Sequence, residues 1–177
     1  MSAHLAIPVG PDDHVRGPAD ATLTVVEYGD YQCPYCAQAY TIVEKLSATF
    51  ATSMRLVFRN LPLADVHPHA ERAAEFAEAV GLQDKFWPMH DRLYENQRSL
   101  GEDALRSYAK DVGADLTKVE EALAGGAPRA RVEADLEGAI RSGANGTPTF
   151  FVNGLRYDGS WFYDEFAEYL QSTLDAL

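Results

Sequence analysis

The sequence contains two cysteines, Cys33 and Cys36, and only Pro34 and Tyr35 separate them. Two thiols at this spacing can form and break a disulfide, because a helix that begins at the first cysteine brings the second within bonding reach. A bridge that closes so short a ring removes little entropy from the unfolded chain and adds little stability. The pair therefore predicts redox chemistry rather than a structural disulfide.

The flanking residues predict a strand before the pair and a helix after it. Residues 22–28 are β-branched and apolar, as in a buried strand, and apolar residues recur every three or four positions from Cys36 to Phe50. Pro34 suits the first helical position. The partial positive charge and free N–H groups of a helix N-terminus favour a thiolate at Cys33. We therefore expect Cys33 to attack a substrate disulfide and the more buried Cys36 to resolve the mixed disulfide.

The rest of the chain predicts an α/β architecture. Further elements are expected at 54–59 (strand), 69–126 (a helical block of four helices), 128–142 (helix), 149–152 and 155–157 (a hairpin of two strands) and 161–174 (helix). This order indicates a thioredoxin-like fold with an inserted all-helical subdomain. The expected division is an irregular N-terminal arm at 1–21, a thioredoxin-like domain at 22–68 and 127–177, and the helical insertion at 69–126.

Pro148 stands immediately before the expected strand at 149–152. A proline takes such a place at the start of a strand or with a cis peptide bond. Together with the cysteine pair, the segments 26–36 and 146–154 resemble the DsbA-like family of thioredoxin-fold thiol–disulfide oxidoreductases. The resemblance implies that a cis-proline loop, here Thr147 and Pro148, faces the dithiol and pairs its backbone with a substrate peptide.

The same resemblance gives roles to other residues near the cysteines. It implies that Pro34 and Tyr35 tune the redox potential, and the archetype's histidine at the position of Tyr35 is absent, which predicts a weaker oxidant. Glu27 lies within the first expected strand, where a buried charge is costly. The resemblance implies a buried acid that relays a proton near Cys36, and the alternative is a carboxylate exposed at the strand end.

Composition excludes some classes of function. The net charge of −12 argues against binding to nucleic acid or to anionic lipid. No apolar run is long enough to span a membrane, and the first residues lack the features of a signal peptide. A cytoplasmic protein is therefore expected, and the alternative is an exported protein whose signal has been removed. The expected partners are protein or glutathione-type thiol substrates and a redox recycling partner, with no cofactor and no metal.

Two alternatives to an exchange enzyme stay open from the sequence. One is a redox-sensing module that switches a partner surface without turnover. The other is a zinc-binding module in which His67 and His69 complete a site with the two cysteines. The direction of electron flow is also open, since a cytoplasmic protein suggests reduction or isomerisation and the family resemblance suggests oxidation.

Overall fold

A mixed five-stranded sheet lies at the centre of the computed structural model, which describes residues 4–177. Its strands are β1 (His14–Arg16), β2 (Leu23–Gly29), β3 (Met54–Asn60), β4 (Thr149–Val152) and β5 (Leu155–Tyr157), in the order β1-β3-β2-β4-β5. The central strands β2 and β3 are parallel, and the other neighbours are antiparallel. The strand that precedes the dithiol is thus the middle strand of the sheet.

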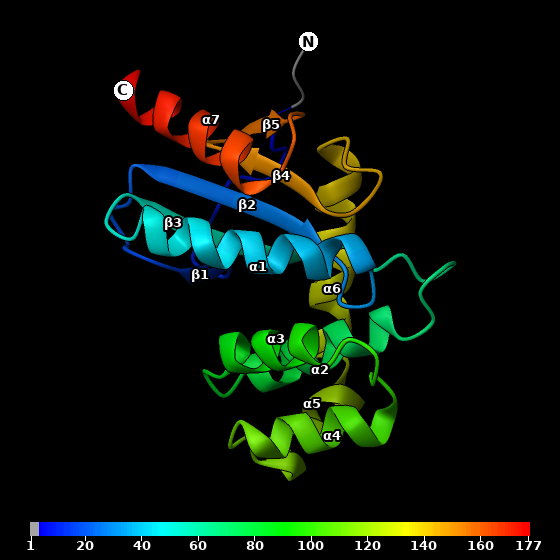
Figure 1. The fold of residues 1–177 in the computed structure, drawn as a ribbon. Helices are drawn as coiled ribbons and strands as arrows, with labels where there is room; N and C mark the ends of the chain where they lie inside the picture. The colour runs from blue at the N-terminus through cyan, green and yellow to red at the C-terminus, as the bar shows by residue number, and fades with distance from the viewer. Residues whose placement is uncertain (1–3) are drawn as a thin grey trace.

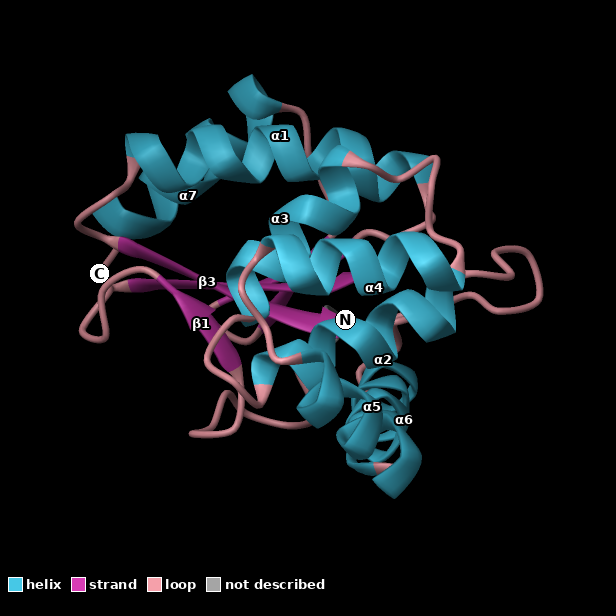
Figure 2. Cartoon of the chain, turned by 90° about the horizontal axis from the view of Figure 1, so that it is seen from below, coloured by secondary structure: helices cyan, strands magenta, loops and turns pink. Residues whose placement is uncertain are grey.

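Helices cover both faces of the sheet (Figures 1 and 2). On one face lie α1 (Pro34–Thr49) and α7 (Tyr163–Asp175), and on the other lies α6 (Ala127–Arg141). Between β3 and α6 the chain forms a block of α2 (Ala70–Gly81), α3 (Phe86–Glu95), α4 (Glu102–Asp111) and α5 (Leu116–Gly125). This is the predicted thioredoxin-like fold with a helical insertion.

Residues of β2 alternate between two apolar clusters. Leu23 and Val25 pack under α1 and α7, whereas Val26 and Tyr28 pack on the side of α6. Because both faces are covered, apolar residues point to both sides of the strand, and Thr24 and Glu27 are its polar members. This burial on both sides holds the end of β2, and with it the start of α1, in a fixed position.

The N-terminal arm differs from the prediction. It was expected to be irregular, but β1 within it pairs antiparallel with β3 and forms an edge of the sheet, with Val15 opposite Val57. A strand of three residues is too short to show a periodic pattern, so its pairing depends on tertiary contacts. Residues 1–3 of the predicted arm lie outside the described residues.

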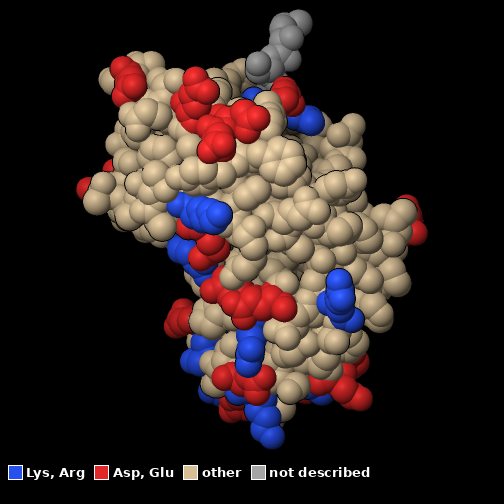
Figure 3. Space-filling view, viewed as in Figure 1, with Lys and Arg blue, Asp and Glu red and all other residues tan. Residues whose placement is uncertain are grey.

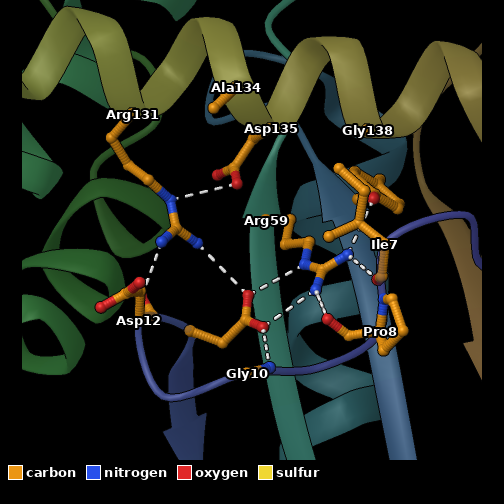
Figure 4. A pocket seen from close by; sticks show the side chains of 11 residues that line it. Ile7, Pro8, Gly10, Asp12, Arg59, Arg131, Ala134, Asp135 and Gly138 are labelled. Atoms are coloured by element: carbon orange, nitrogen blue, oxygen red, sulfur yellow. Dashed lines mark hydrogen bonds and ion pairs between the residues drawn. The ribbon is translucent and has the colours of Figure 1, made fainter.

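Two arginines fasten this arm to the domain (Figure 4). Arg59 is buried and donates through Nε and Nη2 to both carboxylate oxygens of Asp13, each at 2.9 Å. It also donates to the carbonyl oxygen of Ile7 at 2.9 Å, and Arg131 on α6 donates to Asp13 at 3.2 Å. The nitrogens of Arg59 are all used within this joint, so the cavity beside it is part of the attachment of the arm.

The buried face of α1 recurs every three or four residues, as the sequence pattern predicts. Ala39, with Cys36, Val43 and Leu46, lies in the core, whereas Tyr40 is half-buried and packs against the helical block. The ring of Tyr40 stacks on that of Tyr94 in α3, with 5.2 Å between the ring centroids. The last helix begins at Tyr163, two residues later than expected.

Candidate active site

The two cysteines lie at the point where β2 leads into α1. Cys33 is the N-cap residue of α1 with extended backbone angles (φ −69°, ψ 122°), and Pro34 occupies the first turn. Both cysteines are free thiols; Cys36 is fully buried and Cys33 is 3% exposed. Tyr35 between them is 60% exposed and points its ring away from the core. Both cysteines are therefore buried, and Cys33 alone keeps a small exposed area beside the exposed Tyr35.

The loop before β4 faces the dithiol. The peptide bond between Thr147 and Pro148 is cis, and the Cys33 thiol donates to the carbonyl oxygen of Thr147 with 3.6 Å between sulfur and oxygen. The Thr147 hydroxyl oxygen is buried and has no hydrogen-bond partner among the described residues. The fold thus brings together the four residues Cys33, Cys36, Thr147 and Pro148, which the sequence keeps far apart.

The surroundings shift the pKa values of the two thiols in opposite directions. A hydrogen bond from the Cys36 thiol lowers the pKa of Cys33 to about 5. The contact of the Cys33 sulfur with Thr147 and the backbone N–H groups of Cys36 and Tyr35 add to this against the effect of burial. Burial, above all, raises the pKa of Cys36 well above its usual value. At neutral pH the negative charge therefore resides on Cys33.

Glu27 is buried beneath the dithiol rather than exposed at a strand end. Glu27 lies on the middle strand of the sheet, opposite Phe58 on β3 and Phe150 on β4, and it is 2% exposed. Its Oε1 atom has no hydrogen-bond partner among the described residues. Burial raises the pKa of Glu27 to about 8, and the nearby Cys33 charge adds to the shift.

Two polar residues that the sequence did not single out as site residues also contact the dithiol segment. Asp30 accepts hydrogen bonds from the backbone N–H groups of Gln32 and Cys33, at 2.7 and 3.1 Å. Gln97, in the loop after α3, donates to the carbonyl oxygen of Cys33 at 2.7 Å. An aspartate just before a helix is a pattern that can indicate such bonds, whereas Gln97 gives no signal in the sequence.

His67 and His69, the two histidines of the alternative zinc site, have other positions in the fold. His67 contacts a carboxylate oxygen of Asp30 at 2.8 Å through Nδ1, and His69 precedes α2 as its N-cap residue. Across residues 4–177, no three side chains of histidine, cysteine, aspartate or glutamate come together as a metal site. The contacts of His67 link it to the loop before the dithiol instead.

Comparison with known proteins identifies the family. A sequence profile described as thioredoxin matches residues 10–172. A thioredoxin-like oxidoreductase from Silicibacter pomeroyi is 28% identical, with a TM-score of 0.81 over 94% of this chain and 92% of that one. Oxidised BdbD from Bacillus subtilis is 27% identical, with a TM-score of 0.85 over 99% of this chain and 100% of that one.

Curated relatives carry a different kind of name. The Na⁺/H⁺ antiporter NhaA 1 of Salinispora arenicola is 51% identical over 158 residues, and the antiporter NhaA of Herminiimonas arsenicoxydans is 44% identical over 155 residues. The match covers 89% and 87% of this chain but only 24% of either relative's length. Within residues 4–177, the helices are all too short or too polar to cross a lipid bilayer.

The profile match over nearly the whole chain and the two solved oxidoreductases agree with the geometry of the dithiol and the cis-proline loop. The chain therefore belongs to the thioredoxin family and, within it, to the DsbA-like thiol–disulfide oxidoreductases.

Proposed function

We propose that the protein exchanges disulfides with protein or small thiol substrates, with Cys33 as the nucleophile and Cys36 as the resolving thiol. The observation that carries this proposal is the difference between the two thiols. Cys33 lies at the N-terminus of α1 with a pKa of about 5, whereas burial of Cys36 in the first turn raises the pKa of its thiol well above the usual value. A thiolate attacks disulfides and a thiol does not, so the first attack falls to Cys33.

The exchange then proceeds in two steps. The Cys33 thiolate attacks one sulfur of a substrate disulfide, which forms a mixed disulfide and releases the other substrate sulfur as a thiolate. Cys36 gives up its proton and attacks the Cys33 sulfur, which forms the Cys33–Cys36 disulfide and releases the second substrate thiolate. Two electrons pass from the dithiol to the substrate, and the reverse sequence oxidises a substrate dithiol.

Glu27 is the group we assign to the proton of Cys36. Two features support this assignment. After burial and the hydrogen bond with Cys33, the charge of Glu27 also raises the pKa of Cys36, and no hydrogen-bond partner among the described residues competes for Glu27 Oε1. When Glu27 is ionised it can accept the proton that Cys36 must lose before it attacks. A pKa of about 8 suits this task near neutral pH.

The surface around the dithiol suits an extended peptide substrate. Thr147 and Pro148 present a backbone edge beside Cys33, and the exposed ring of Tyr35 lies next to it. Residues 34–43 of α1 contain no charged side chain, and the surface near this end of the helix carries few charges in Figure 3. We assign substrate contact to Pro34, Tyr35, Thr147 and Pro148, and expect a separate redox partner to recycle the dithiol.

Single cysteine variants test the proposal. Cys33→Ser is expected to abolish insulin reduction and glutathione-linked exchange, because the attacking thiolate is lost. Cys36→Ser is expected to accumulate mixed disulfides at Cys33, because the resolving thiol is lost. Retained exchange in Cys33→Ser would overturn the proposal, and a reversible disulfide with no turnover in the unsubstituted protein would favour the redox-sensing alternative.

The antiporter relatives favour a second, more specific function. Proteins named as Na⁺/H⁺ antiporters contain a segment that is 37–51% identical to this chain. We therefore infer that this protein exchanges disulfides with a transporter of that kind. Cys36→Ser, incubated with a membrane fraction of the source cells, traps its partners as mixed disulfides. Mass spectrometry is expected to find an antiporter among them, and adducts with other proteins alone would contradict this function.

A further inference from the structure

One carboxylate oxygen of Asp30 binds the backbone of the residues that lead into the dithiol. The side chain is shielded completely from solvent. Its Oδ1 accepts the N–H groups of Gln32 and Cys33, and its own carbonyl oxygen accepts the Cys33 N–H at 3.2 Å. The side chain of Cys33, the N-cap residue, makes no capping hydrogen bond to the first turn of α1. The backbone of the attacking cysteine is therefore anchored by Asp30.

The other oxygen reaches a second loop. Asp30 Oδ2 accepts the N–H of Leu63 at 2.8 Å and contacts His67 Nδ1 at 2.8 Å. Both residues belong to the segment 61–69, which joins β3 to the helical block. Gln32 adds a parallel link, because its Oε1 accepts the N–H of His69 at 2.7 Å. A single buried carboxylate thus joins the dithiol loop to the loop that enters the insertion.

The position of the Cys33 sulfur depends on this anchor. The low pKa of Cys33 comes from the hydrogen bond with the Cys36 thiol, the contact of the sulfur with Thr147 and bonds from nearby backbone N–H groups. Those bonds persist only while the Cys33 backbone keeps its place between α1 and the loop of Thr147. A carboxylate that accepts four hydrogen bonds holds its partners strongly, because bonds to a charged acceptor are stronger than neutral ones.

We propose that Asp30 is a positioning residue of the dithiol, which acts by tying the backbone of Cys33 to the segment 61–69 through Leu63 and His67. This inference rests on the proposed exchange function and adds a residue to it. Asp30 does not touch the substrate. It keeps Cys33 where its thiolate is stabilised, so it sets both the reactivity of Cys33 and the balance between dithiol and disulfide.

Asp30→Asn is the first test. An asparagine oxygen can still accept the N–H groups of Gln32 and Cys33, but its NH2 group opposes the Leu63 N–H, so the link to the second loop breaks. We expect the pKa of Cys33, followed by thiolate absorbance, to rise by about one unit or more. The reduction potential is expected to become more negative, since a less stabilised thiolate favours the disulfide.

The direction of the change separates positioning from other roles. Loss of a negative charge close to a thiolate would by itself lower the pKa of Cys33. A fall in that pKa would thus overturn the proposal, and so would a loss of stability with the pKa and the potential unchanged. Asp65→Asn is the matched control, because Asp65 lies exposed in the same segment and its substitution removes the same charge without a hydrogen bond.

A pair of substitutions at His67 tests the link if Asp30→Asn does not fold. His67→Gln keeps a donor for Asp30 Oδ2, whereas His67→Leu has none. We expect the leucine variant to shift the pKa and the potential as Asp30→Asn does, and the glutamine variant to restore them. Equal values in both variants would overturn the proposal. Failure of the exchange function shows separately, as an unsubstituted protein that forms no reversible Cys33–Cys36 disulfide.

Discussion

Replacement of Glu27 by glutamine is expected to change how the stability of the protein depends on pH. Burial raises the pKa of Glu27 from 4.5 in the unfolded chain to about 8 in the fold. Between these values the folded protein keeps a proton that the unfolded chain has lost, so the free energy of unfolding falls as pH rises through this window. Glutamine carries no titrating proton and removes this dependence.

The size of the effect follows from the shift. At pH 7 the unfolded carboxyl is ionised and the folded one is still protonated, which costs the folded state about 3 kcal/mol at about 1.4 kcal/mol per pKa unit. At pH 4 both states are largely protonated and the cost is close to zero. The stability of Glu27→Gln relative to the unsubstituted protein is therefore expected to improve by about 3 kcal/mol between pH 4 and pH 7.

Urea unfolding of the reduced proteins at a series of pH values measures this difference. Any constant effect of the amide, such as an unpaired N–H group, shifts the whole curve and leaves its slope unaltered. Titration of Cys33 is largely common to both proteins, so their difference isolates residue 27. Glu137→Gln serves as the control, since Glu137 is exposed on α6. Parallel curves for Glu27→Gln and the unsubstituted protein from pH 4 to pH 8 would refute the reasoning.

Three further outcomes are expected. The thiolate absorbance of the reduced protein is expected to titrate with a midpoint near pH 5. Cys36→Ala is expected to raise this midpoint, because the hydrogen bond from Cys36 contributes most to the low pKa of Cys33. An unchanged midpoint in Cys36→Ala would contradict this assignment. Since the pKa of Cys33 is lowered from 9.0 to about 5, the reduced form gains stability as pH rises between these values, about 3 kcal/mol by pH 7. This makes the dithiol about 60 mV more oxidising at pH 7 than one with an ordinary thiol, as equilibration with glutathione measures. An equilibrium constant with glutathione that stays the same between pH 5 and pH 7 would refute the low pKa, because an ordinary dithiol takes up as many protons as glutathione does in this range. Gly29→Ala lowers the free energy of unfolding by about 1–3 kcal/mol in urea titration, because an added Cβ would lie 2.5 Å from the ring of Phe58, whereas Gly125→Ala, with open space around it, does not.

The parts of the site that the sequence predicted are those set by local pattern. A cysteine pair that opens a helix and a proline that opens a strand each have a local physical meaning, and the fold places Cys33 and Pro148 accordingly. Glu27 could be predicted as buried because valines precede it in a strand covered on both faces. The functional roles of these residues remain predictions for the cysteine and Glu27 variants to test.

The parts that the sequence did not predict depend on contacts between distant segments. The strand β1 pairs with β3, and the bond between Asp13 and Arg59 beside it joins residues that are 46 apart. The bond from Gln97 to Cys33 joins residues that are 64 apart. Neither contact leaves a periodic pattern, because each uses one side chain from a loop or a strand end. Such contacts follow from the packing of the helical block and the arm against the sheet, and no local propensity specifies them.

Glu27 and Asp30 show most clearly what spacing cannot tell. They stand three residues apart, both are buried, and both lie within reach of the dithiol segment. Asp30 is surrounded by four donor groups from two loops, whereas Oε1 of Glu27 has no partner among the described residues. The same functional group is therefore suited to hold a backbone at one position and to hold a proton at the other. The loop 61–69 determines which carboxyl group holds the backbone and which holds a proton, because N–H groups of Leu63 and His67 in this loop reach Asp30 and not Glu27.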